Sequence, residues 1–470
     1  MEKNYLYGLT VQGIQSYIFA TNKLKEIIGA SEIIEQLCTT WFYDFLTKEE
    51  CKGSIRHLNA AGNIRFETDK STAQRIFRDY HSILLEKAPG VPFSQAVVEI
   101  ETDKEKEALE KLDKLLNAER NIPNQLDLGI MSRRKARRTG NAASLLKDAD
   151  KELTDFSTGE KFENADKEAI KTKTDLDYSF PLEFKDLTKG GKDSWLALIH
   201  IDGNNMGNRI NNIKDYSTDI LTDLKEFSVN IEKATIKAFN DATHKIANSI
   251  SVKENDTNNT LPMRPIVLGG DDVTLIIRAD LAIPFVEEFL TVFEEETNRL
   301  TVFKEKAKFT EGLTACAGIA FIKEKFPFHY SSHLAEELST HAKNKSGREA
   351  SCLSFHQVSD SFIDDYNEII KRELTTIHKF KFNVEAYYLK GKNTIKELND
   401  TIDSLQSKDT PTNDIRNFVD ILFHGEKSEI ENKRKAFHKK NTNNNYTKII
   451  ENEKYFIDYL TLLSLENEDN

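Results

Sequence analysis

Residues 264–278 have the pattern of a β-hairpin with two carboxylates at its tip. Two short apolar runs flank the tetrapeptide Gly269-Gly270-Asp271-Asp272. Glycine lets a backbone approach a phosphate closely, and carboxylates are the hard oxygen ligands that divalent cations such as Mg²⁺ prefer. The pattern therefore predicts a strand, a turn and a strand that hold a divalent metal ion against a nucleotide. Taken alone, the same tetrapeptide is also an ordinary hairpin turn.

A third acid follows a second apolar segment. Residues 195–201 have the character of a buried strand, and Asp202 comes directly after them. If this strand lies beside the hairpin, Asp202, Asp271 and Asp272 surround two Mg²⁺ or Mn²⁺ ions, as two-metal phosphoryl transfer requires. We predict that these three acids are catalytic and bind both metal ions. One ion would activate a ribose hydroxyl, and the other would hold the triphosphate.

The glycines and the loop beside these acids are predicted to bind the nucleotide. Gly269 and Gly270 would admit it to the hairpin, because they carry no side chain. The backbone amides of Gly203, Asn204 and Asn205 would cradle its phosphates. All five residues are sequence neighbours of the predicted metal ligands.

Length and composition favour a multidomain protein without a membrane anchor. With 470 residues, of which 39% are hydrophobic, the chain can bury two or three cores. The longest apolar run, residues 313–322, is far too short to span a bilayer, and the N-terminus lacks the pattern of a signal peptide. The four cysteines show no close pairing in the sequence, which argues against a zinc ribbon or a disulfide framework. We therefore expect a cytoplasmic protein with reduced cysteines.

The predicted elements repeat one order twice. The first series comprises a strand at 5–11, helices through residue 37, a strand region at 57–66, a helix at 71–87 and a strand at 93–100. This gives a β-α-β-β-α-β order, which is the ferredoxin-like unit. The second series comprises a strand at 195–201, a helix at 216–248, the hairpin at 264–278, a helix at 281–303, a strand at 312–322 and a helix at 331–345.

The predicted fold class is therefore α+β, with two ferredoxin-like palm domains in tandem and a helical C-terminal domain. We expect the first palm over residues 1–120, a helical and basic linker over 121–190, the second palm over 191–355 and the helical domain over 356–470. The last domain shows amphipathic helical patterns and no catalytic constellation. Its expected role is packing or partner binding.

These motifs resemble a known family, the large polymerase-like subunit of type III CRISPR effector complexes, and more distantly the GGDEF nucleotidyl cyclases. The similarity covers residues 5–355. In that family two palms face each other, and only the second carries the Gly-Gly-Asp-Asp hairpin. The resemblance implies that Asp202 is the first metal-binding strand end, although Asn204 stands where many relatives have a second acid. It also implies that the first palm, whose hairpin segment at 60–66 lacks acids, binds no catalytic metal.

The resemblance also points to Lys343 and Ser31. Residues 313–320 resemble the strand after the catalytic hairpin, and residues 338–343 resemble the helix that follows this strand, so Lys343 matches a lysine that contacts triphosphate in GGDEF enzymes. A lysine near three acids also suits the balance of phosphate charge, although a solvated helix lysine gives the same pattern. Residues 12–31 resemble the start of the first palm, which in the family helps to hold a second nucleotide, and Ser31 could approach it through its hydroxyl. A helix that begins after Gly29 would instead explain Ser31 as its N-cap.

Two departures from the family limit the expected chemistry. The sequence has no His-Asp doublet, so nuclease activity of the HD type is not expected. The inter-palm region carries no cysteine, so a structural zinc is not expected there. It carries instead the run Arg-Arg-Lys-Ala-Arg-Arg at 133–138. This run could meet RNA, a partner that bears nucleic acid or the phosphates of a product, or it could be a solvated loop of a protein whose net charge is −12.

The leading hypothesis is a metal-dependent nucleotidyltransferase that converts ATP into cyclic or short linear oligonucleotide signals in antiviral defence. A second hypothesis keeps the metal site and makes a cyclic dinucleotide from GTP or from mixed nucleoside triphosphates. A third is a non-enzymatic, nucleotide-binding scaffold subunit of an RNA-binding assembly. RNA or RNA-binding protein subunits are the expected partners, a homo-oligomer is left open, and no membrane partner is expected.

Overall fold

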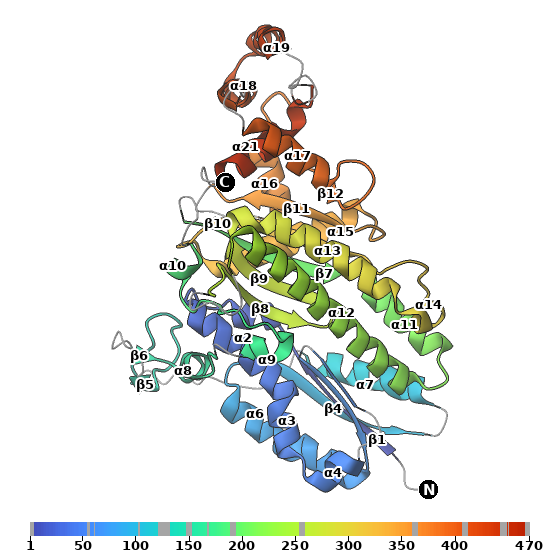
Figure 1. Cartoon of the computed structure of the whole chain (residues 1–470). Coiled ribbons are helices and arrows are strands. Elements are labelled where there is room, and N and C mark those ends of the chain that lie inside the picture. The colour runs from blue at the N-terminus through green and yellow to red at the C-terminus, as the bar shows by residue number, and fades with distance from the viewer. Residues whose placement is uncertain are drawn as a thin grey trace.

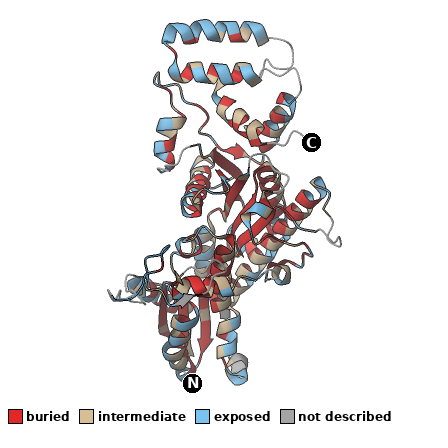
Figure 2. Ribbon diagram, turned by 90° about the vertical axis from the view of Figure 1, so that its left-hand side faces the viewer, coloured by how far each residue is buried: buried red, intermediate tan, exposed pale blue. Residues whose placement is uncertain are grey.

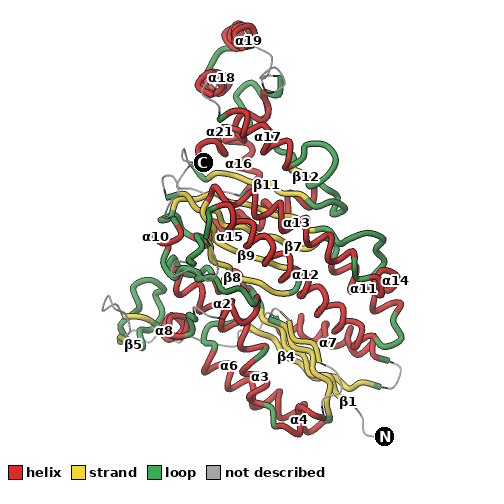
Figure 3. The backbone as a smooth tube through the Cα atoms, in the orientation of Figure 1, coloured by secondary structure: helices red, strands yellow, loops and turns green. Residues whose placement is uncertain are grey.

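The computed structural model describes residues 4–53, 57–60, 62–101, 104–120, 132–146, 153–166, 169–188, 194–252, 259–359, 365–406, 412–441, 449 and 451–465. Within these residues, two large β-sheets follow one another along the molecule, and a group of helices lies beyond the second of them (Figures 1 and 3). Most strand residues with described burial are buried in both of these sheets, whereas the helices farthest from the N-terminus expose much of their surface (Figure 2).

The first sheet has four strands in the order β2-β3-β1-β4. These strands are β1 (Asn4–Val11), β2 (His57–Ala60), β3 (Asn63–Thr68) and β4 (Phe93–Ile100). The helices between β1 and β2 are α1 (Ile14–Ile18), α2 (Leu24–Cys38), α3 (Thr40–Phe45) and α4 (Lys48–Gly53). Those between β3 and β4 are α5 (Lys70–Arg75), the π-helical turn η1 (Ile76–Tyr80) and α6 (His81–Lys87). This chain order and strand order confirm the ferredoxin-like unit predicted for the first palm.

One helix of the first palm differs from the prediction. α2 runs from Leu24 to Cys38, so Ser31 lies in its middle and the expected N-cap at Ser31 is wrong. Gly29 does not start a new helix. A Cβ at Gly29 would stand 1.6 Å from the carbonyl oxygen of Lys161, so the glycine allows close packing of two backbones.

The second sheet has six strands in the order β12-β11-β10-β7-β9-β8. These strands are β7 (Trp195–Gly203), β8 (Met263–Gly269), β9 (Asp272–Arg278), β10 (Ala315–Lys323), β11 (Cys352–Gln357) and β12 (Tyr387–Tyr388). The helices of this region are α11 (Met206–Tyr216), α12 (Ile220–Ser249), η2 (Ala279–Leu281), α13 (Ala282–Asn298), α14 (Thr301–Lys306) and α15 (Phe328–Lys345). The four strands β10-β7-β9-β8 repeat the arrangement of the first sheet, which confirms the second palm. Because β11 and β12 extend this sheet, it continues beyond residue 355, where we placed a domain boundary.

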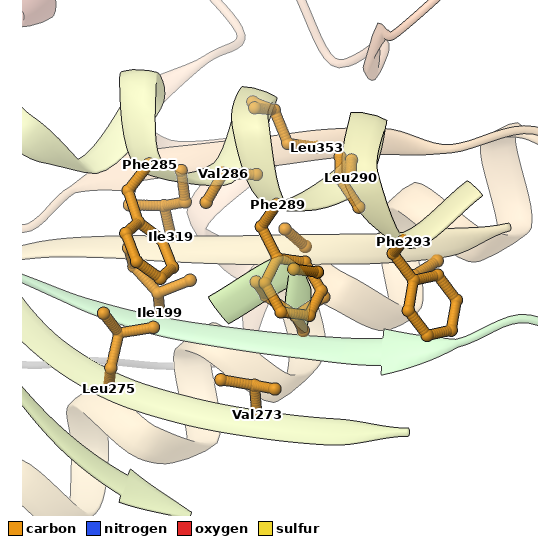
Figure 4. Close-up of a cluster of buried hydrophobic side chains, with 14 of the residues drawn as sticks. Ile199, Val273, Leu275, Phe285, Val286, Phe289, Leu290, Phe293, Ile319 and Leu353 are labelled. Atoms are coloured by element: carbon orange, nitrogen blue, oxygen red, sulfur yellow. The ribbon is translucent and has the colours of Figure 1, made fainter. Parts of the chain in front are cut away.

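Helices cover both faces of the second sheet. On one face, side chains of β7, β9 and β10 pack against α13, as Figure 4 shows for Ile199, Leu275, Ile319, Phe285 and Phe289. On the other face, α15 lies against β10, where Ser339 donates a hydrogen bond to the carbonyl of Cys316 at 3.1 Å. The hydrophobic cluster of this second face also includes residues of α2, so the first palm packs against the second through a shared core.

The remaining elements belong to the inter-palm region and the C-terminal region. The former is preceded by α7 (Glu105–Glu119), which follows β4 within the first palm, and contains β5 (Leu145–Leu146), β6 (Leu153–Thr154), α8 (Phe156–Glu163), α9 (Ala169–Thr174) and α10 (Phe184–Leu187). The latter contains α16 (Tyr366–Glu373), α17 (Ile395–Leu405), α18 (Thr412–His424), α19 (Lys427–Asn441), η3 (Glu453–Tyr455) and α21 (Phe456–Leu465). Among the described residues, none of the helices combines the length and the apolar character needed to cross a membrane.

Candidate active site between the palms

Two of the three predicted acids lie opposite each other in the second sheet. β7 and β9 are antiparallel, and Asp202 is the register partner of Asp272. Directly opposite residues of antiparallel strands project to the same face, so these carboxylates are neighbours. The apolar run of β7 ends just before Asp202, whose side chain is 41% exposed near the end of this strand.

The third acid sits in the hairpin turn. Gly269 pairs with Asp272, which leaves Gly270 and Asp271 as a two-residue turn. Gly270 has φ of +60°, a left-handed conformation that favours glycine. Asp271 Oδ2 lies 2.7 Å from the point where a Cβ on Gly203 would stand, so the side chain of Asp271 reaches over the end of β7. The three acids therefore converge, although they come from elements 69 residues apart in the sequence.

Burial and mutual repulsion change the ionisation of the hairpin acids. Burial, followed by the charges of Asp202 and Asp272, raises the pKa of Asp271 to about 7. Burial, followed by the charges of Asp202 and Glu336, raises the pKa of Asp272 to about 8. A cation bound among these carboxylates would relieve this repulsion.

Lys343 already supplies one positive charge to the cluster. It lies in the last turn of α15, is 5% exposed, and donates hydrogen bonds to Asp202 Oδ2 and, at 3.1 Å, to the carbonyl of Gly203. The structure thus places Lys343 beside the acids rather than in solvent. Its contact with a triphosphate stays a prediction.

Two further ionisable residues adjoin the acids and were missed in the sequence. His200 Nδ1 lies 3.4 Å from Asp272 Oδ1 and 3.2 Å from the hydroxyl of Thr274, and burial lowers the pKa of this histidine. Burial raises the pKa of Glu336, whose charge acts on both Asp272 and His200. Local signals existed for both residues. His200 stands two residues before Asp202 on the same strand face, and Glu336 stands two helical turns before Lys343.

The acids fit Mg²⁺ or Mn²⁺ by donor type. Asp272 Oδ1 is buried and has no hydrogen-bond partner among the described residues, and all three side chains offer hard oxygen atoms. As they stand, no three His, Cys, Asp or Glu side chains in the described part of the chain are grouped closely enough to hold a metal ion. Lys343 contacts Oδ2 of Asp202, so a metal ion would bind Oδ1 or share Oδ2 with Lys343.

A cavity of about 660 Å³ opens between the two palms beside Asp272. The second palm contributes Gly269, Asp272 and Glu336 to its wall. The first palm contributes polar side chains that include Gln12, Gln15, Ser31, Asn63 and Arg65. Its volume is in the range of pockets that bind ligands of nucleotide size.

Two contacts between the palms form part of this wall. Gln15 of the first palm donates to the hydroxyl of Thr274 of the second at 3.2 Å. Ser31 donates to the carbonyl of Ile266 in β8. The hydroxyl of Ser31 is therefore engaged with the second palm, while the residue still lines the cavity.

The loop after Asp202 differs from the expectation. The N–H of Asn204 donates to the carbonyl of Thr314 at 2.8 Å, and its side-chain amide donates to the hydroxyl of Thr314 at 2.9 Å. This backbone amide is therefore not free to cradle a phosphate. Asn205 has φ of 59°, donates to the carbonyl of Arg348 at 3.0 Å, and lines a different cavity of about 760 Å³ together with Asn204.

Residues 195–352 match the model of a protein family described as Cas10/Cmr2, second palm domain. The second palm is therefore Cas10-like. The matched residues begin with β7 and end at the first residue of β11, so they contain the hairpin, Asp202 and Lys343. No curated protein sequence matches the chain.

Solved structures share the fold of this chain. A crystal structure of a Csm1–Csm4 cassette in complex with cA3 contains a chain with 12% sequence identity and a TM-score of 0.57, and the match covers 99% of this chain and 70% of the other. An apo Csm1–Csm4 cassette gives 13% identity and a TM-score of 0.55 over 98% of this chain and 70% of the other. A cassette in complex with pppApApA gives 12% identity and a TM-score of 0.57 over 98% and 69%. At these identities the likeness shows the fold alone.

The basic run divides into one arginine that contacts a buried carboxylate and several arginines that face solvent. Arg138 donates to both carboxylate oxygens of Glu26 at 2.8 and 2.9 Å, and Glu26 is only 2% exposed. Arg133, Arg134 and Arg137 are exposed. The run is thus anchored to α2 by Arg138, and its other arginines face solvent. Residues 189–192, whose sequence Lys-Gly-Gly-Lys predicts a flexible entry to the second palm, lie outside the described residues.

Proposed function

We propose that the second palm is a metal-dependent nucleotidyltransferase that joins ATP into cyclic or short linear oligonucleotides, which act as signals in antiviral defence in the cytoplasm. The observation that carries this proposal is the convergence of Asp202, Asp271 and Asp272 at the end of the sheet, with Asp272 on the wall of a cavity between two palms. An acid cluster next to a cavity of nucleotide size is suited to phosphoryl transfer.

Each group of residues has a distinct task in this proposal. Asp202, Asp271 and Asp272 would hold Mg²⁺ or Mn²⁺, which when bound lowers the pKa of an attacking hydroxyl and neutralises the leaving pyrophosphate. Lys343 brings a buried positive charge to the same strand end and would pair with the phosphates. Gly269 and Gly270 leave the hairpin without side chains where a nucleotide would approach. Polar residues of the first palm, such as Gln12 and Arg65, would contact a nucleotide on the opposite wall.

The solved relatives support the choice of ATP and of a protein partner. Csm1–Csm4 cassettes have been crystallised with one ATP, with pppApApA and with cA3. We extend adenine nucleotides and a Csm4-like subunit to this chain as part of the proposal. RNA binding by that assembly is part of it as well, and the exposed arginines of the basic run supply a surface of suitable charge.

The test is product formation from labelled ATP and Mn²⁺ by the full chain, alone and with RNA and its native partner subunits. The expected result is pyrophosphate release and oligoadenylate products, both abolished by Asp271→Asn combined with Asp272→Asn. Asp241→Asn is the matched control, since Asp241 forms an ion pair with Lys237 on the surface of α12 at 2.6 Å. Absence of any acid-dependent pyrophosphate release, with any nucleoside triphosphate, overturns the proposal and leaves a nucleotide-binding scaffold.

A further inference from the structure

Two cysteines lie side by side in the second sheet. Cys316 of β10 is the direct register partner of Cys352 of β11, and their sulfur atoms are 3.4 Å apart. Both residues are fully buried free thiols. Neighbouring strands are about 4.8 Å apart, which lies within the Cα separations of about 4.4 to 6.8 Å that disulfides span. The backbone therefore permits a bond between these sulfur atoms without separating the strands.

The cysteine pair contacts the two elements that hold the Lys343–Asp202 ion pair, which are α15 and β7. On its other side, Cys316 is the register partner of Asp202 in β7. The thiol of Cys352 donates to the carbonyl of Ala342 at 3.3 Å, one residue before Lys343 in the last turn of α15. Cys316 is thus paired directly with Asp202, and the residue that Cys352 contacts is the one before Lys343. A change in the cysteine pair therefore occurs beside both partners of the ion pair.

A route for a small molecule leads to the cysteine pair. The side-chain amide of Asn204 donates to the sulfur of Cys316 at 3.4 Å, and the thiol of Cys316 donates to the carbonyl of Ala350 at 3.6 Å. Both Asn204 and Ala350 line the cavity of about 760 Å³ on that side of the second palm. One layer of residues therefore separates the sulfur of Cys316 from a cavity that a small oxidant can enter.

We infer that Cys316 and Cys352 are a redox modification site, at which a hydroperoxide forms a reversible disulfide that weakens metal and nucleotide binding at Asp202. The effect on binding rests on the proposed function, whereas disulfide formation does not. The ligand class is hydrogen peroxide or a small organic hydroperoxide, because the buried position excludes bulky disulfides.

The oxidation balances as a two-electron transfer. One cysteine sulfur attacks a peroxide oxygen, the O–O bond breaks, and the first water leaves, so that the attacking cysteine becomes a sulfenic acid. The second cysteine sulfur then attacks the sulfenic sulfur, the S–O bond breaks, and a second water leaves. Two thiols and one hydrogen peroxide thus give one disulfide and two waters, with the sulfurs oxidised and the peroxide reduced.

Disulfide formation would disturb the neighbours of the pair. The sulfur atoms must approach from 3.4 Å to about 2.05 Å, and both S–H donors are lost. The carbonyls of Ala342 and Ala350 then lose their thiol donors, and the last turn of α15 must follow Cys352. Because this turn positions Lys343, we expect the affinity for Mn²⁺ with ATP to fall by about tenfold, the size of change seen when residues behind metal ligands are altered.

The experiment treats the reduced full chain with hydrogen peroxide, blocks the remaining free thiols, and identifies cross-linked peptides by mass spectrometry without reduction. The expected result is a peptide that joins Cys316 to Cys352 and is separated again by dithiothreitol. Binding of Mn²⁺ with ATP, measured by calorimetry, should fall in the oxidised chain and recover after reduction. In Cys352→Ala, and independently in Cys316→Ser, peroxide should leave binding unchanged.

Cys38→Ala is the matched control. Cys38 is also buried, at the end of α2 in the first palm, and this variant should keep the wild-type response to peroxide. Free thiols at both positions after peroxide treatment overturn the inference, and so does a disulfide that leaves binding unchanged. If the reduced chain binds no Mn²⁺ with ATP, the proposed function fails, while the cross-link still decides whether the redox site exists.

Discussion

Lys343 donates a hydrogen bond to Asp202 across the open end of the second palm. The side chain of Lys343 is 6% exposed, whereas that of Asp202 is 41% exposed. The ammonium group of Lys343 is therefore buried beneath α15, and the carboxylate of Asp202 is partly exposed to solvent. This arrangement places a positive charge where a phosphate would approach the acid cluster.

Replacement of Lys343 by Met should impair product formation much more than binding of the adenine base. We expect kcat/KM for ATP to fall by about 100-fold, since a preorganised positive charge at the reacting phosphates is removed. The measurement is pyrophosphate release with Mn²⁺. Lys345→Met is the control, because Lys345 lies two residues further on α15 and pairs with Glu385 at 2.9 Å. Equal losses in the two variants would show that Lys343 has no special role.

Replacement of Thr235 by Val tests whether α12 fixes the hairpin. Thr235 is fully buried, and its hydroxyl donates to the carbonyl of Gly270 at 2.6 Å. Valine keeps the shape and loses this bond, so we expect a loss of about 1 kcal/mol in the free energy of unfolding. Product formation should fall as well, because the turn that presents Asp271 is no longer held. Both effects are measured by urea denaturation and by pyrophosphate release.

Thr243→Val is the control for this comparison. Thr243 is equally buried on the same helix, but its hydroxyl donates to the carbonyl of Phe239 within α12. Its replacement should leave product formation close to that of the wild type. If Thr243→Val impairs product formation as much as Thr235→Val does, the contact to Gly270 does not position the hairpin.

Local patterns in the sequence are sufficient to predict the repeated fold. The apolar run of β7 and the two apolar arms around Gly269 to Asp272 predict strands without reference to distant residues, and their order defines the palm. The same patterns predict that Asp202 and the hairpin acids meet if the strands are adjacent. That condition depends on sheet order, which the β-α-β-β-α-β series constrains strongly.

Features that depend on register or on backbone bonding could not be predicted in this way. The contact between Cys316 and Cys352 arises from the pairing of two parallel strands, and nothing in the local sequence sets that register. The hydrogen bond from the backbone N–H of Asn204 to the carbonyl of Thr314 likewise depends on which strand lies beside β7. In the sequence alone Gly29 indicates a helix boundary, which places Ser31 at a helix start. In the structure, Gly29 lies inside α2, and close packing against α8 is the reason for a glycine at this position.

Mutations should distinguish one structural arginine of the basic run from its surface arginines. Arg138→Ala leaves the carboxylate of Glu26 buried without its guanidinium partner, so we expect a loss of about 2 kcal/mol in the free energy of unfolding. Arg133, Arg134 and Arg137 are exposed, and their combined replacement by Ala should leave thermal stability unchanged. If the triple variant retains full RNA binding, the run is a solvated loop. A fully stable Arg138→Ala variant would contradict the structural role of that residue.

The pH dependence of stability should report on Asp458 in α21. Asn383 and Tyr387 donate to Asp458 Oδ2 at 2.8 and 2.6 Å, yet burial raises the pKa of this carboxyl to about 6. The folded chain therefore binds a proton that the unfolded chain has already released between about pH 4 and pH 6. Stability contributed by this site falls as the pH rises through that window and is constant above it.

Replacement of Asp458 by Asn should remove this dependence. The amide oxygen still accepts from Tyr387 and Asn383, but no charge is buried, so the variant should exceed the wild type by about 3 kcal/mol above pH 6 and match it near pH 4. Urea denaturation across this pH range measures both limits. Asp403→Asn, at an exposed position of α17, should keep the wild-type profile. A profile of Asp458→Asn that stays parallel to the wild type would mean that a group other than Asp458 causes the pH dependence.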